Sequence, residues 1–72
     1  MIDEILRHLQ THGTCDRAEL AVVLDASEHR VALALGFLEK YALVDRDFLG
    51  VRLAPVTLRF LRDLDAASTA HN

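Results

Sequence analysis

Apolar residues recur along most of this 72-residue chain at intervals of three and four, which is the period of a helix with one buried face. The first such stretch, residues 2–12, is followed by Gly13, a residue that favours the end of a helix. A shorter stretch at 17–24 and a longer one at 28–41 have the same spacing, and residues 25–27 interrupt the pattern between them. The pattern therefore predicts three helices in this part of the chain.

The periodicity changes after the third predicted helix. Across residues 43–53, apolar and polar residues alternate on both sides of a short turn and Gly50, which is typical of a β-hairpin. Pro55 then fits the first turn of a fourth helix, where its missing N–H costs nothing. We expect this helix to end near residue 65, and we expect 66–72 to form a flexible tail because it has few residues that can pack. The apolar side of the fourth helix comprises Val56, Leu58, Phe60, Leu61 and Leu64.

Polar residues suited to capping stand before two of the predicted helices. Asp16 and Glu19 have the spacing of a capping box, and Ser27 can accept a hydrogen bond from the turn that follows it. Residues 14–16 are too few for anything but a turn or a short strand. We expect Val23 on a buried face and a core made of Ile5, Leu9, Leu20, Leu24, Val31, Leu35, Leu38, Val44, Leu53, Leu58 and Leu61.

The composition fits one folded domain over residues 1–65. Of all residues, 51% are hydrophobic, with three Gly and one Pro, unlike a disordered segment. The net charge is −3, from eight Lys or Arg and eleven Asp or Glu, so a nucleic-acid-binding surface would need a local basic patch. The chain has a single cysteine, Cys15, its N-terminus does not resemble a signal peptide, and it contains no long apolar run. These features predict a cytoplasmic protein without a membrane segment.

The order of these elements, together with several spaced residues, resembles the winged helix-turn-helix family of small archaeal and bacterial transcriptional regulators. The resemblance covers residues 2–64 and rests on Leu20-Ala21, Ser27, Val31, Leu38-Glu39-Lys40, Leu43-Val44 and Leu53-Ala54-Pro55. It implies a mainly α fold with a small β-hairpin (α+β), in the order helix, strand, helix, helix, two hairpin strands, helix. Ala42 departs from the family, which usually has Gly where the backbone turns left-handed, and Ala54 replaces a capping Thr.

The resemblance implies a DNA-binding transcriptional regulator that acts as a dimer. Helix 28–41 would enter the major groove of double-stranded DNA, and the hairpin at 43–53 would touch its backbone. Arg30 can reach a guanine or a phosphate, and the acids around Arg46 weaken the basic character of the hairpin. The residues expected to contact DNA are Ser27, Glu28, His29, Arg30, Leu33, Lys40, Arg46 and Arg52.

The same helix supports a different interpretation, because much of its outward face is apolar. Ala32 and Gly36 are small residues four apart, which permits close approach of another helix, and Leu33 and Phe37 form an apolar ridge beside them. On this interpretation the domain binds a protein partner or a second copy of itself through these four residues. A third possibility is that the hairpin and the last helix cover Phe37 and that Leu33 is an isolated exposed residue.

The sequence contains no pattern that indicates catalysis, a cofactor or a small-molecule substrate. It has no Gly-rich phosphate loop and no nucleophile with a base at motif spacing, so we expect no enzyme. His8, His12 and Cys15 lie close in the sequence, but zinc requires four ligands or three with a water, and no fourth residue is obvious nearby. We therefore expect no metal site, with solvated histidines and a small buried cysteine instead.

Overall fold

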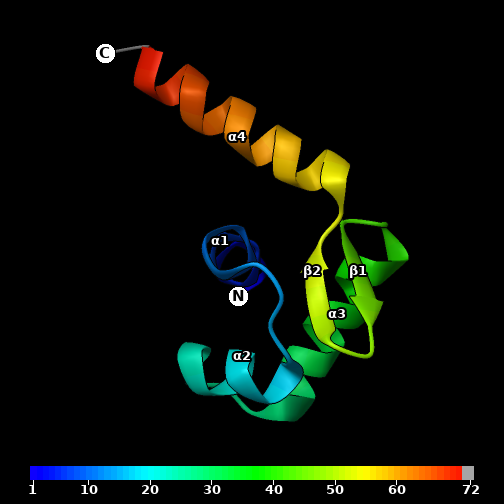
Figure 1. The fold of residues 1–72 in the computed structure, drawn as a ribbon. Helices are drawn as coiled ribbons and strands as arrows, with labels where there is room; N and C mark the ends of the chain where they lie inside the picture. Colours follow the sequence, from blue (N-terminus) through cyan, green and yellow to red (C-terminus); the bar gives the residue numbers. More distant parts are fainter. Residues whose placement is uncertain (71–72) are drawn as a thin grey trace.

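The computed structural model describes residues 1–70, which form four helices and one antiparallel hairpin (Figure 1). In chain order the elements are α1 (Ile2–His12), α2 (Arg17–Leu24), α3 (Glu28–Lys40), β1 (Val44–Asp47), β2 (Gly50–Leu53) and α4 (Pro55–Ala70). The first three helices and the hairpin pack together, and α4 extends away from them past α1. The predicted class, mainly helical with a small hairpin, is confirmed.

The helix starts form where the sequence predicted them because their caps are local. The side chain of Asp16 accepts a hydrogen bond of 2.7 Å from the backbone N–H of Glu19, and that of Ser27 accepts one of 3.2 Å from Arg30. Each bond satisfies a backbone donor that a helix leaves unpaired in its first turn. At the C-terminal end of α1, Gly13 adopts a φ of 81°, and its N–H donates a hydrogen bond to the carbonyl of Leu9.

The hairpin is joined by a third short segment from the beginning of the chain. The strands β1 and β2 pair in the register Val44 to Leu53 and Asp47 to Gly50. Cys15 pairs with Val51 in an isolated antiparallel bridge, through backbone bonds of 3.0 and 2.8 Å in the two directions. The predicted turn or short strand at 14–16 is therefore a one-residue strand, and it links the first two helices to the hairpin.

The core lies where α1, α2 and α3 meet the inner side of the hairpin. Most of the predicted core residues are buried, while Leu24 and Leu58 are half-buried at its edge. The prediction for Val23 is wrong, since its side chain is 51% exposed. In α2 the buried residues are Leu20, as predicted, and Ala21, whose small side chain allows α2 to lie close to its neighbours. Cys15 and Val51 complete the core beneath the bridge.

The turn from α3 into the hairpin keeps the backbone conformation that usually calls for glycine. Ala42 has a φ of 57°, in the left-handed region, and its N–H bonds to the carbonyl of Glu39. The next residue, Leu43, donates to Leu38 at 2.9 Å, which closes the helix end. The helix itself ends at Lys40, one residue before the predicted boundary. Alanine is tolerated here because these two bonds hold the turn.

Only part of the broad apolar surface of α4 meets the rest of the molecule. Thr57 and Leu61 are buried and Leu58 is half-buried, whereas three residues predicted on the apolar side, Val56, Phe60 and Leu64, are exposed. These three lie four residues apart and form one stripe along the helix. The helix also continues to Ala70, five residues beyond the predicted end, so most of the predicted tail is helical here; residues 71 and 72 lie outside the described residues.

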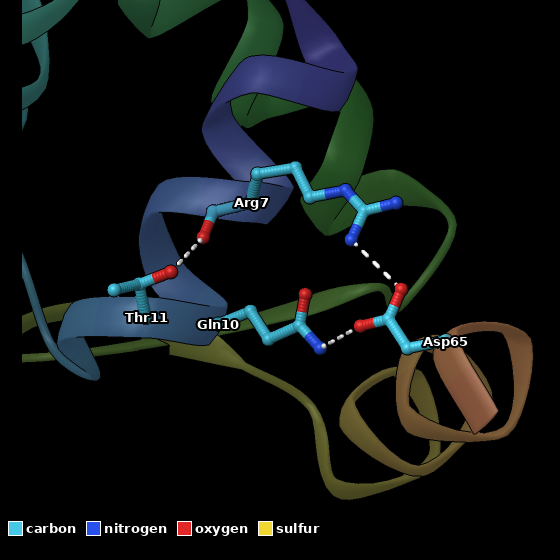
Figure 2. A network of polar contacts seen from close by, with 4 residues as sticks. All are labelled: Arg7, Gln10, Thr11 and Asp65. Carbon is cyan, nitrogen blue, oxygen red and sulfur yellow. Dashed lines mark hydrogen bonds and ion pairs between the residues drawn. The ribbon is translucent and has the colours of Figure 1, made fainter. Parts of the chain in front are cut away.

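A polar network holds the middle of α4 against α1. The carboxylate of Asp65 accepts hydrogen bonds from the guanidinium of Arg7 at 3.0 Å and from the amide of Gln10 at 3.1 Å, and both side chains point toward it from α1 (Figure 2). Thr11 donates to the backbone carbonyl of Arg7 one turn earlier. The bonds from Arg7 and Gln10 lower the pKa of Asp65, because they stabilise its ionised carboxylate.

Candidate nucleic-acid interface

The residues that the resemblance assigned to DNA contact all lie on the outside of the molecule. Every one of them is exposed, and they come from two adjacent elements, since the hairpin packs against α3 (Figure 1). Ser27 stands at the start of α3, and the hairpin supplies the two arginines. The set comprises Ser27, Glu28, His29, Arg30, Leu33, Lys40, Arg46 and Arg52.

The two acids of α3 lie on one edge of the helix, where each forms an ion pair with an arginine from a neighbouring element. Glu28 is 3.5 Å from the guanidinium of Arg17 at the start of α2, and Glu39 is 3.2 Å from that of Arg46 in β1. Glu28 and Glu39 are eleven residues apart, about three helical turns, so they share this edge. Their charges therefore face α2 and the hairpin and not the open side of α3.

The open side of α3 carries cations and no acid. Within residues 1–70, no acidic group lies at ion-pair distance from His29, Arg30 or Lys40. Arg30 stands in the first turn, and the ammonium of Lys40 lies 5.9 Å from the ring centroid of Tyr41 at the far end. The protein as a whole is acidic, but this face of α3 displays Arg30 and Lys40 without a neutralising acid, as a DNA-binding surface on an acidic protein requires.

The hairpin arginines are paired inside the chain. Arg52 lies 3.6 Å from Asp47, and Asp47 also accepts a hydrogen bond of 2.8 Å from the N–H of Leu49 in the turn. The sequence predicted that Asp45 and Asp47 would offset Arg46, but the carboxylate paired with Arg46 is that of Glu39. Exposed ion pairs of this kind contribute about 0–1 kcal/mol, so a phosphate can replace the acid at little cost.

An exposed apolar ridge runs beside the cations on α3. Leu33 is 64% exposed, Phe37 48% and Tyr41 57%, and the rings of Phe37 and Tyr41 lie 4.8 Å apart. A Cβ added to Gly36 would meet nothing within 4 Å, so this part of the helix faces open space. The possibility that the hairpin and α4 cover Phe37 is therefore wrong. Sequence reasoning missed Tyr41, although its position four residues after Phe37 places it on the same face.

The tip of the hairpin is apolar, which sequence reasoning also missed. Phe48 is 96% exposed and Leu49 69%, and together they form the turn between β1 and β2. The sequence analysis identified the hairpin from its alternating pattern and did not single out these two residues. Two adjacent large apolar residues in a turn are themselves unusual, and that pair could have identified the tip as a contact surface.

A second group of chemically active side chains lies on the inner side of α1 and α2. His8, Cys15 and Glu19 place their nitrogen, sulfur and oxygen atoms within 4.8 Å of one another. Burial, a hydrogen bond with Glu19 and the negative charges of Glu19 and Asp16 raise the pKa of the Cys15 thiol to about 12. His12, which the sequence grouped with His8 and Cys15, lies outside this cluster and stacks on the His8 ring, with the two ring centroids 4.1 Å apart. The sequence singled out Glu19 only as part of a helix cap and not as a possible ligand.

Comparisons with known proteins do not assign this chain to a family. No family model matches the sequence, and a search of curated proteins finds no significant match. Among the described residues, no helix is long and apolar enough to cross a membrane.

Proposed function

We propose that this chain is a winged helix-turn-helix DNA-binding domain in which α3 enters the major groove and the β1–β2 hairpin acts as the wing. The observation that carries the proposal is the basic, acid-free open side of α3, which displays Arg30 and Lys40 next to the hairpin. The element order and the bridge between Cys15 and Val51 support it, since both belong to the architecture that the sequence resembles.

Each exposed group on this surface has a chemical role in the proposal. Arg30, in the first turn of α3, is able to donate two hydrogen bonds to a guanine or to hold a phosphate. The N-terminus of α3 adds the partial positive charge of the helix dipole at the same end. Leu33 can meet a thymine methyl group, and Lys40 can reach the backbone. Arg46 and Arg52 would exchange Glu39 and Asp47 for phosphates.

The proposal predicts a definite dependence of DNA affinity on salt. With Arg30, Lys40, Arg46 and Arg52 each neutralising one phosphate, the slope of log K against log salt should be about −3.6 per chain, and Arg30→Ala should reduce it to about −2.7. Fluorescence anisotropy with a random-sequence duplex at several salt concentrations measures both slopes.

Arg62→Ala is the matched control, because it removes an exposed arginine from α4, which the proposal does not place on DNA. This variant should keep the wild-type slope. If the wild type does not bind duplex DNA at low salt, or if Arg62→Ala reduces the slope as much as Arg30→Ala, then the proposal is wrong.

The exposed ridge on α3 favours a second candidate, a protein-interaction domain that pairs with a second copy of itself. Ala32 and Gly36 permit two α3 helices to cross closely, and Leu33 and Phe37 would then be buried between the copies. Because the crossing would centre on Gly36, the helix ends would diverge and the cations there would not be forced together. In this arrangement α3 is covered and cannot enter a DNA groove.

Sedimentation equilibrium separates the two candidates. Pairing through α3 predicts a dimer that Gly36→Gln converts to a monomer. The glutamine side chain fits on the surface of a single chain, but it would clash with the second α3 helix in the dimer. Phe60→Asp, which changes the exposed stripe of α4, is the control and should leave that dimer intact. A monomeric wild type, or a dimer that only Phe60→Asp disrupts, would exclude pairing through α3 and leave this helix free for DNA.

A further inference from the structure

Three side chains with metal-binding atoms meet at a junction of three segments. His8 comes from the middle of α1, Cys15 from the one-residue strand that pairs with Val51, and Glu19 from the first turn of α2. Their donor atoms lie within 4.8 Å of one another, although the residues are separated by seven and four positions in the chain. The fold therefore brings together one nitrogen, one sulfur and one oxygen ligand.

One of these atoms lacks a partner that its burial would normally require. The side chain of His8 is 12% exposed, and its Nε2 atom is buried with no hydrogen-bond partner among the described residues. The closest acceptor, Oε2 of Glu19, is 3.6 Å away, which is too far for a hydrogen bond. Buried polar atoms are rarely left unpaired, so an unpaired nitrogen directed at a thiol and a carboxylate indicates that something else binds there.

The electrostatic environment of the cluster favours a cation. Cys15 is buried, and the carboxylates of Glu19 and Asp16 act on its sulfur atom. The negative charges of these two carboxylates attract a divalent ion, which would neutralise them. Glu19 is half-exposed, so it leaves an entry path from solvent on the α2 side.

We propose that His8, Cys15 and Glu19 form a binding site for a divalent transition metal, with Zn²⁺ as the ion that fits the donors best. A set of imidazole, thiolate and carboxylate ligands is typical of zinc, which takes three protein ligands and a water at a tetrahedral site. Metal–ligand bonds of about 2.0–2.3 Å put the donors about 3.3–3.8 Å apart. The cluster must therefore contract by roughly 1 Å at its widest when the metal binds.

The metal would act as a clamp on the fold. It would tie α1 to α2 directly, and through Cys15 and its backbone bonds to Val51 it would tie both helices to the hairpin. On binding, the Cys15 thiol gives its proton to solvent and the thiolate becomes the ligand. Binding to the folded chain alone stabilises it, so the metal should raise its melting temperature. This inference does not depend on what α3 binds.

Cobalt(II) titration of the full chain under reducing conditions tests the site. We expect one Co²⁺ per chain, with the visible bands of a tetrahedral ion and a sulfur-to-cobalt charge-transfer band, and we expect Zn²⁺ to displace the cobalt. Cys15→Ser should abolish the charge-transfer band. His8→Gln and Glu19→Gln should each weaken binding by at least about tenfold, since even residues that only support metal ligands contribute about 10–100-fold.

His12→Gln is the matched control, because His12 stacks on His8 and lies outside the cluster. It should bind Co²⁺ as the wild type does, and circular dichroism should show that every variant remains helical. Glu19→Gln alters an exposed side chain, so its result stands even where Cys15→Ser fails to fold. The site is excluded if Co²⁺ gives no charge-transfer band with the wild type, if Glu19→Gln binds as tightly as the wild type, or if His12→Gln loses the band.

Discussion

Leu35→Ala is expected to lower the free energy of unfolding by about 3–5 kcal/mol, because it opens a cavity at the centre of the core. Leu35 lies on the inner side of α3 and is completely buried. A chain of this length is stabilised by only about 4–11 kcal/mol in total, so the variant should be largely unfolded at moderate urea concentrations. Urea denaturation followed by circular dichroism measures the loss.

Leu33→Ala provides the matched control for that experiment. It makes the same chemical change two residues earlier on the same helix, at a side chain that is 64% exposed. Its effect on the free energy of unfolding should stay within about 0.5 kcal/mol, as for most surface substitutions. Similar losses for the two variants would contradict the arrangement of α3 described above, in which one face packs and the other is open.

Gly50→Ala is expected to lower the free energy of unfolding by about 3 kcal/mol, through backbone strain and a clash together. Gly50 has a φ of 137°, a conformation that residues with a side chain rarely adopt. An added Cβ would also lie 2.7 Å from the carbonyl oxygen of Cys15, which is backbone and cannot move aside freely. The substitution should therefore break the bridge between Cys15 and Val51 and loosen the hairpin.

Gly13→Ala separates the two contributions to the effect at Gly50. Gly13 also has a positive φ, of 81°, but an added Cβ there would meet nothing within 4 Å. It should cost only the strain, about 1–2 kcal/mol. Urea denaturation compares the stabilities, and hydrogen exchange at the amides of Cys15 and Val51 reports on the bridge. If Gly50→Ala is no more destabilising than Gly13→Ala and leaves those amides protected, then the close contact with Cys15 has no energetic role.

Burial within a helix was predictable only where the apolar stripe is narrow. Val31, Leu35 and Leu38 form such a stripe on α3, and all three are buried as predicted. In α4 the apolar residues cover a much wider arc, and the sequence could not tell which part would be covered. The body of the protein covers Thr57 and Leu61 but leaves Phe60 exposed, because only one side of α4 faces the rest of the fold.

The partners of charged and metal-binding side chains were even less predictable. Arg46 was expected beside the aspartates that flank it in the sequence, but in the fold its partner is Glu39 of α3. Glu19 was recognised only as part of a cap, although the fold places its carboxylate beside His8 and Cys15. In both cases the deciding contact joins different elements, and no spacing within one element encodes it.

The sequence by itself determined the local elements of this protein: the helix starts at Asp16 and Ser27, the hairpin, and the buried stripe of α3. These depend on hydrogen bonds and side-chain contacts between residues a few positions apart, which composition and spacing specify directly. The tertiary structure alone decided which face of α4 stays exposed and which arginines pair with the acids of α3. It also decided that His8 and Glu19 lie beside Cys15. Those outcomes depend on how whole elements pack, and packing is settled by shape and charge across the entire core.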